Sequence, residues 1–199
     1  MASILKVDTI QDQSGNNIIN ENADTITIGA SGDTITVPTG ASLTIPNGGL
    51  SGQNYPAFEA YLSADQTISD DTLTKINVNT EVFDTDGCYD NSTNYRFTPT
   101  VAGKYFVYWS CFGLAVSNNV INTNAFIYFN GSQYNGAGIA GNAVMSGGSA
   151  TALAIIDFNG STDYVEFYLK VDASSGTVRA EADFSGGRTT FAGAYRIGA

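Results

Sequence analysis

The sequence contains no histidine and only two cysteines among its 199 residues, which excludes most of the common catalytic and metal centres. Without histidine the chain cannot form a Ser-His-Asp or Cys-His constellation, and it lacks the usual general base. Zinc sites are mostly built from sets of cysteine and histidine, which two cysteines cannot supply. We therefore expect no enzyme activity and no cofactor. We expect Cys88 and Cys111 to be reduced, partly buried thiols, with a disulfide between them as the alternative.

Basic residues are also scarce. The chain has 8 Lys and Arg against 19 Asp and Glu, a formal net charge of −11. Nucleic-acid affinity depends on cations that displace phosphate counterions, and anionic membranes attract basic segments, so both partners are disfavoured. No apolar run approaches the roughly 20 residues of a membrane span. Met1–Asp8 lacks a basic region followed by an apolar core. We therefore expect no membrane insertion, no signal peptide, and folding in a cytoplasm.

The carboxylates that remain suggest two kinds of site. Asp84, Asp86 and nearby Asp90 offer clustered oxygens, the ligands that calcium prefers, although their spacing does not fit an EF-hand loop. A solvated acidic turn is the alternative. Neighbouring carboxylates occur at Asp70/Asp71, Asp84/Asp86 and Glu181/Asp183. A glycan-cleaving site would need two carboxylates about 5–9.5 Å apart in a groove.

What the sequence does have is the composition of strands and turns. It holds 22 Gly, 11 Phe and 11 Tyr, and no convincing run of apolar residues at a spacing of 3.6. Residues 1–54 contain no Phe, Tyr or Trp, so we do not expect them to form a core alone. We predict an N-terminal hairpin over 1–22, a repetitive β-stalk with a Gly-rich joint over 23–54, and a head over 55–199.

The stalk prediction rests on a short repeat. Asp24–Gly29 is echoed nine residues later by Asp33–Pro38, and more loosely by Ser42–Pro46. Each copy is one alternating strand followed by a turn, and such a unit buries its apolar edge only against neighbours or other chains. Three chains wound together would form a continuous apolar axis. A disordered linker is the alternative.

The head is predicted to be all-β, a two-sheet sandwich or jelly roll without helices. The ten expected strands are Phe58–Ser63, Thr74–Asn79, Glu81–Phe83, Tyr95–Phe97, Lys104–Val116, Ala125–Asn130, Ala150–Phe158, Tyr164–Val171, Val178–Phe184 and Thr189–Ile197.

Two of these strands, 104–116 and 125–130, are largely apolar on both faces. An antiparallel sandwich normally leaves one face of each sheet wet, so a second apolar face predicts a further burial partner. Together with the stalk, this favours a homotrimer; loops that cover the outer face within one chain are the alternative. The expected interface residues are Phe106, Tyr108, Phe112, Phe126 and Tyr128.

The segment from Phe97 to Tyr105 resembles the signature of the complement component 1q-like head, a jelly roll related to the tumour necrosis factor fold. Phe97, five residues, Gly103, one residue and Tyr105 give the spacing of that motif, and Thr190–Tyr195 is similar to the closing strand of the family. The departures are valines at 78 and 107, where aromatic residues are usual, and one extra residue between Tyr89 and Phe97. The resemblance implies a trimeric head on a stalk.

A second resemblance lies in the N-terminal segment. Lys6–Asp12 followed by Ser14–Asn16 looks like the start of tail-fibre proteins of marine bacteriophages, cyanophages especially, and the repeat at Asp24–Gly29 is similar to sequences in the same setting. This implies a homotrimeric phage tail fibre or spike on the virion, assembled in the host cytoplasm. Its N-terminus would bind other virion tail or capsid proteins, and its head a host surface glycan or protein. A purely structural decoration or head fibre protein is the alternative, followed by a glycan-cleaving tail spike.

Receptor-binding residues are expected on loops, where binding residues concentrate. If strand 104–116 runs away from the stalk, the alternation of strand directions brings Ser117–Asn124, Asp157–Asp163 and Ser185–Arg188 to the far end of the head. Their polar side chains suit hydrogen bonds to a glycan or a surface protein, although plain surface loops are the alternative. The candidates are Asn118, Asn119, Asn122, Asn159, Ser161 and Arg188.

Overall fold

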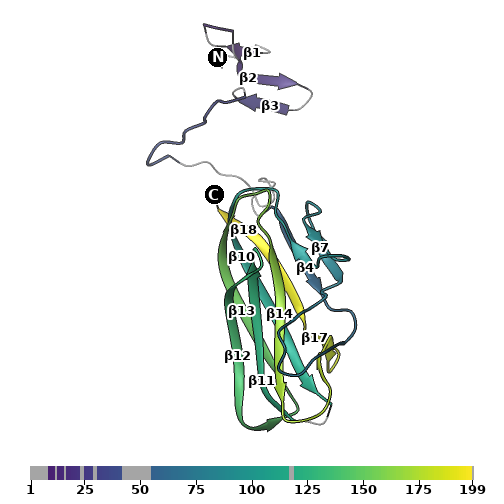
Figure 1. The fold of residues 1–199 in the computed structure, drawn as a ribbon. Helices are drawn as coiled ribbons and strands as arrows, with labels where there is room; N and C mark the ends of the chain where they lie inside the picture. Colours follow the sequence, from purple (N-terminus) through teal and green to yellow (C-terminus); the bar gives the residue numbers. More distant parts are fainter. Residues whose placement is uncertain are drawn as a thin grey trace. The chain divides into compact units, whose positions relative to one another are not determined.

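The computed structural model describes residues 9–11, 13–15, 17–22, 25–28, 31–41, 55–116 and 119–198. The chain divides into two compact units, Met1–Leu50 and Ser51–Ala199. Every regular element of the described residues is a β-strand (Figure 1). This confirms the predicted all-β class. In the part of the chain that the structure describes, no helix is long and apolar enough to cross a membrane.

The first unit contains a three-stranded antiparallel sheet. Its strands, in spatial order, are β1 (Thr9–Gln11), β2 (Asn17–Asn22) and β3 (Thr25–Ile28). The predicted hairpin is present, since Thr9 pairs with Asn20 and Ile10 with Ile19. The first repeat copy forms β3 and pairs with β2, so one sheet continues across the division expected after residue 22.

The second repeat copy behaves differently from the first. Residues 33–38 form no strand, and Ile35 and Val37 are 64% and 43% exposed. An alternating sequence becomes a strand only where it pairs with a neighbouring strand, and within the described residues this copy belongs to no sheet. The third copy lies outside the described residues. The shared stalk stays a prediction.

The second unit, the head, is a sandwich of two antiparallel sheets with its core between them (Figure 1). The larger sheet has the order β5 (Gln66–Ile68), β15 (Val178–Ala180), β10 (Gly103–Ala115), β18 (Phe191–Gly198), β4 (Ala57–Tyr61), β7 (Thr80–Asp84), and β13 (Gly147–Phe158) also pairs with β10. The smaller sheet has the order β12 (Ser132–Met145), β11 (Val120–Phe129), β14 (Val165–Ala173), β9 (Arg96–Phe97), β8 (Tyr89–Asp90), and β6 (Thr74–Lys75) also pairs with β14. A small separate hairpin joins β16 (Asp183–Phe184) to β17 (Gly187–Arg188).

One long strand, β12, was not among the ten predicted strands. Its sequence is rich in Gly and Ala, including Gly136 and Gly138, and such residues have low intrinsic strand propensity. It forms because it pairs with β11 along most of its length, from Ser132 opposite Phe129 to Met145 opposite Val120. Tertiary pairing therefore overrides local propensity here.

The predicted alternation along β10 is confirmed. Tyr105, Val107, Trp109 and Cys111 are each 0% exposed and form the inner side of the strand. The polar tip of Trp109 is satisfied, since its indole N–H donates to the carbonyl of Tyr168 at 2.9 Å. Cys88 and Cys111 are free and buried, which confirms the prediction of two thiols, and burial raises the pKa of the Cys111 thiol.

The motif from Phe97 to Tyr105 builds one end of the core. Phe97 stacks on Phe58 at 4.7 Å and meets Tyr105 edge-on at 5.8 Å. Gly103 has a φ of +140°, and a Cβ there would lie 2.4 Å from the carbonyl oxygen of Gly198. Only glycine fits this close approach between β10 and the end of β18. The signature spacing therefore serves the packing of the fold.

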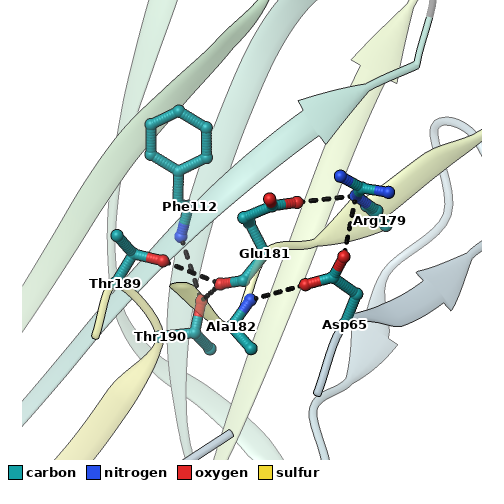
Figure 2. A network of polar contacts seen from close by, with 7 residues as sticks. All are labelled: Asp65, Phe112, Arg179, Glu181, Ala182, Thr189 and Thr190. Carbon is teal, nitrogen blue, oxygen red and sulfur yellow. Dashed lines mark hydrogen bonds and ion pairs between the residues drawn. The ribbon is translucent and has the colours of Figure 1, made fainter. Parts of the chain in front are cut away.

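A polar network closes a gap in the larger sheet (Figure 2). β10 pairs with β18 up to Ser110 and with β15 from Gly113, so Phe112 between them has no partner in either ladder. The Phe112 N–H donates to Thr190 Oγ1 at 3.2 Å, and the Glu181 N–H donates to the Phe112 carbonyl at 2.9 Å. Side-chain and loop groups thus satisfy the backbone where the strand changes partners.

Candidate functional site

The outer side of the larger sheet carries a continuous apolar surface, which we call the apolar face. It consists of Phe106, Tyr108 and Phe112 on β10, Leu153 and Ile155 on β13, and Phe191 and Tyr195 on β18. Strand register makes these residues neighbours: Ile155, Phe106 and Tyr195 lie opposite one another across three strands. Leu153 and Ile155 are 50% and 57% exposed, and Tyr195 is 38% exposed. Such a patch on a soluble protein marks an interaction surface.

The centre of the apolar face is held flat by a glycine. A Cβ at Gly193 would lie 2.2 Å from the Tyr108 ring, so the ring lies across the backbone of β18. There the Tyr108 hydroxyl donates to Glu59 Oε2 on β4 at 2.8 Å. Burial, followed by the hydrogen bond to the Glu59 carboxylate and its negative charge, raises the pKa of Tyr108 above its ordinary value. The Tyr108 hydroxyl thus stays protonated and keeps its hydrogen bond to Glu59.

The outer side of the smaller sheet differs in chemistry, and we call it the polar face. It consists of Asn122, Asn124, Phe126 and Tyr128 on β11 and Glu166, Tyr168, Lys170 and Asp172 on β14. Two lysines form ion pairs on this face: Lys75 Nζ lies 2.7 Å from the Glu166 carboxylate, and Lys170 Nζ lies 2.7 Å from the Asp71 carboxylate. Tyr128 packs on Tyr168 with ring centroids 4.4 Å apart. Charge pairing and aromatic packing suit a face that stays in water.

The structure divides the five predicted interface residues between these two faces. Phe106, Tyr108 and Phe112 belong to the apolar face, whereas Phe126 and Tyr128 lie on the polar face of the other sheet. β10 and β11 follow each other along the chain but belong to different sheets, so their outward side chains point away from each other. One contiguous surface of a single head therefore cannot contain all five.

A groove of about 410 Å³ opens on the polar side of the β11–β12 hairpin. Glycines shape its floor, because a Cβ at Gly136 would lie 2.6 Å from the Phe126 ring and one at Gly138 would lie 2.1 Å from Asn124 Oδ1. This groove was not predicted from the sequence, because the strand that forms half of it was not predicted. It is lined by Asn124, Phe126, Gln133, Tyr134, Asn135, Gly136, Ala137 and Gly138.

The three loops predicted to share one end of the head lie at different places, so that prediction is wrong. The loop from β10 to β11 lies at the end where Ala115 pairs with Val178. The loop after β13 lies at the other end, where Phe158 pairs with Gly103 and β18 finishes (Figure 1). Because β12 adds one unpredicted reversal of chain direction, the loop after β13 lies at the opposite end of the head from the one predicted. The β16–β17 hairpin lies beside the sheet, with Phe184 stacked on Phe112.

The predicted receptor-binding residues at the first end hold the loop structure together. Asn119 Nδ2 donates to Ser175 Oγ at 2.6 Å, and Asn122 Nδ2 donates to Asp172 Oδ2 at 3.1 Å. Both bonds tie β11 to the end of β14 and the turn after it. Asn118 lies outside the described residues.

The remaining candidates lie elsewhere. Asn159 Oδ1 accepts from the backbone N–H groups of Ser161 and Thr162, both at 2.9 Å, so this asparagine organises its own turn. The Arg188 guanidinium lies 3.9 Å from the centre of the Tyr61 ring. The structure does not bring the receptor-binding candidates together, and their role in receptor binding stays a prediction.

The acidic residues considered for calcium do not converge. Asp90 accepts from the backbone N–H groups of Ser92, Thr93 and Asn94, and these bonds hold the pKa of its carboxyl well below its usual range. Asp84 Oδ2 accepts from the backbone N–H of Tyr89 at 2.8 Å. Within the described ranges, no group of three or more metal-ligating side chains could hold an ion. The geometry therefore favours the interpretation of this segment as a solvated acidic turn.

The neighbouring carboxylates considered for glycan cleavage also have structural partners. Glu181 lies 2.6 Å from Arg179, which also lies 3.3 Å from Asp65 (Figure 2). Asp71 pairs with Lys170, and Asp70 Oδ1 accepts from the backbone N–H of Ala173 at 2.8 Å. These carboxylates thus form ion pairs or accept hydrogen bonds from the backbone.

No protein-family model and no curated protein matches the sequence. Among solved structures, murine APRIL is similar with a TM-score of 0.51 and 9% identity, over 71% of this chain and 98% of its own. The head is a jelly roll. Eiger TNF from S. frugiperda is also similar (TM-score 0.49, 10% identity, 71% of this chain, 91% of its own), as is the globular domain of zebrafish complement 1qA (0.46, 12%, 70% and 93%). The similarity to murine APRIL supports the jelly-roll fold that the motif from Phe97 to Tyr105 implied.

Proposed function

We propose that the protein is a homotrimeric, non-catalytic phage tail fibre or spike. Its N-terminal unit would attach to other virion tail or capsid proteins, and its jelly-roll head would bind a surface molecule of the host cell. The observation that carries the proposal is the apolar face, a set of neighbouring aromatic and aliphatic side chains on one sheet that are partly to half exposed. A single chain leaves this face in water, so copies of the chain are its natural cover.

The energetics favour a stable assembly. A standard interface buries roughly 800 Å² per partner. About 56–65% of such an area is apolar, and apolar burial contributes about 25 cal/mol per Å², so the gain is on the order of 11–13 kcal/mol per partner before costs. Association costs an estimated 4–15 kcal/mol or more in lost motion, and side-chain ordering adds to this. A surface rich in rigid aromatics keeps the ordering cost low, because each ring has few rotamers to lose.

The outer edge of β13 favours association through side chains rather than through strand addition. The Tyr134 hydroxyl donates to the carbonyl of Ile155 at 3.0 Å, and Asn135 Nδ2 donates to the carbonyl of Leu153 at 2.5 Å. These β12 side chains occupy acceptors that an incoming strand would need. Contact between copies would therefore use the apolar face.

Two features support the proposal that three chains associate around a common axis and that the trimer lies on the virion surface. The repeat leaves Ile35 and Val37 exposed in one chain, as expected of a unit that buries its apolar side against other chains. The N-terminal segment resembles the start of marine phage tail fibres, and assembly in the host cytoplasm would then precede release.

One observation favours a second candidate, a purely structural virion decoration protein. The loop residues predicted to bind a receptor are scattered, and Asn119, Asn122 and Asn159 are each engaged in bonds that hold loops or strand ends. A protein without a receptor would show this arrangement.

Two measurements test the proposal. Multi-angle light scattering of the purified full-length chain should give three times the mass of one chain at micromolar concentration; a stable soluble monomer would contradict the trimer. Purified protein should also block adsorption of the corresponding phage to host cells. A trimer that leaves adsorption unchanged would favour the decoration protein over the fibre.

A further inference from the structure

We propose that the groove on the β11–β12 hairpin binds a neutral saccharide. The inference rests on the proposed function, since it names the class of host molecule that the head would recognise. The groove has a volume of about 410 Å³, within the roughly 300–1,000 Å³ of small-molecule sites. Of the three predicted receptor loops, it shares only Asn124, the last residue of Ser117–Asn124.

Two amides in the groove are free to bind a ligand. The side chains of Asn124 and Gln133 have no partner within the described residues, whereas Asn135 and Tyr134 are used to cover the edge of β13. Each free amide offers two donors and one acceptor carbonyl. Sugar hydroxyls both donate and accept, so paired amides match them better than charged groups would.

An aromatic ring lies between these amides along the strands. Phe126 lies opposite Gly136, and its ring lies against the backbone of that glycine. Asn124 and Gly138 form the next outward pair on one side, and Tyr128 with Gln133 the pair on the other. A pyranose ring has one face of C–H groups, which packs on an aromatic ring while its rim of hydroxyls reaches neighbouring amides. Phe126 with Asn124 and Gln133 provides this combination.

The charges indicate a neutral ligand. Among the described residues, no lysine or arginine lines the groove, and the nearest strand position with a cation, Lys170 opposite Asn124, is paired with Asp71 at 2.7 Å. The chain as a whole carries a formal charge of −11. An anionic sugar would meet repulsion without a compensating cation. Because the groove opens on the polar face, association through the apolar face leaves it open.

The experiment uses the full-length wild-type chain on a glycan array that carries neutral hexose and N-acetylhexosamine oligosaccharides beside sialylated and sulfated ones. We expect binding confined to neutral glycans. For the strongest binder, Asn124→Ala and Phe126→Ala should each raise the dissociation constant about tenfold or more in titration calorimetry. Tyr168→Phe is the control, because it removes a polar group from the same polar face outside the groove, and it should change affinity less than twofold.

Each outcome separates this inference from the proposed function. Binding of anionic glycans only, binding of none, or equal affinity of the wild type and Phe126→Ala would overturn the saccharide groove. Binding of a host protein that is insensitive to these variants would do the same. Light scattering on the same samples reports the trimer: a trimeric protein without glycan binding defeats the groove alone, whereas a monomer defeats the proposed assembly.

Discussion

The two outer faces of the jelly-roll head share a scaffold but differ in what they leave unsatisfied. The apolar face leaves aliphatic side chains such as Leu153 and Ile155 half-exposed in the part of the chain that the structure describes. The polar face pairs its cations and packs its tyrosines against each other, and its two amides Asn124 and Gln133 have no partner among the described residues. Unburied hydrocarbon indicates association with a large surface, whereas unbonded amides beside a ring indicate a small polar ligand.

A tyrosine–glutamate pair occurs on each face and shows the same contrast. On the apolar face Tyr108 donates to Glu59, which has no ion-pair partner among the described residues. On the polar face Tyr168 donates to Glu166 at 3.2 Å, and Lys75 neutralises that carboxylate. The carboxylate of this pair on the polar face thus has a cation beside it within one chain. The carboxylate on the apolar face has none among the described residues.

The largest expected effect comes from placing charge on one face and then on the other. The double variant Leu153→Asp/Ile155→Asp should dissociate the trimer, raising its dissociation constant more than about 100-fold, because buried unpaired carboxylates are costly. Phe126→Asp on the polar face should leave the mass unchanged. Light scattering over a concentration series measures both. Loss of the trimer in Phe126→Asp but not in the double variant would reverse the assignment of the faces.

A medium effect should follow from the glycines that seat an aromatic ring on each face. Gly193→Ala forces Tyr108 off β18 and away from Glu59, and should lower the free energy of unfolding by about 1–3 kcal/mol and weaken the trimer. Gly136→Ala displaces Phe126 on the edge hairpin, so it should weaken glycan binding while the trimer persists. Urea denaturation and light scattering compare them. Equal loss of assembly in both variants would contradict the distinction between the faces.

Side-chain alternation predicted the inner and outer sides of β10 from the sequence, because burial on one side is a local property of a strand. Tyr105 and Trp109 are buried and Phe106 and Tyr108 are not, as expected. What alternation cannot show is which sheet a strand joins. Phe126 on β11 looks equivalent to Phe106 in sequence, yet the two lie on opposite faces, since pairing over long sequence distances decides the sheet.

The missed strand had larger consequences than its own residues. β12 has the glycines that a propensity argument assigns to a loop, and those glycines are also what opens the groove beside Phe126 and Asn124. Close backbone approach, rather than strand preference, explains their presence. Omitting β12 also moved the loop at Asn159 to the wrong end of the head. The same feature thus concealed the candidate groove and misplaced the candidate loops.

The smallest expected effect is the response of each face to alkaline pH. Burial first, then the charge of Glu166 and the hydrogen bond to it, raises the pKa of Tyr168 to about 12. Burial and then Glu59 also raise the pKa of Tyr108 above its ordinary value. Unfolded tyrosine titrates near pH 10. The folded state therefore holds these protons more tightly, so their stabilisation is complete below pH 10 and is lost as pH rises towards 12.

Urea midpoints at pH 9, 10.5 and 11.5 should fall with pH, and less steeply in Tyr168→Phe and Tyr108→Phe, which lack the titrating hydroxyl. The two variants separate the faces when the protein is diluted. If copies cover the apolar face, assembly buries Tyr108 further, so the slope that Tyr108→Phe removes should shrink below the concentration at which the trimer dissociates. The slope that Tyr168→Phe removes should not depend on concentration, because the polar face stays in water. The same concentration dependence in both variants would mean that assembly covers both faces.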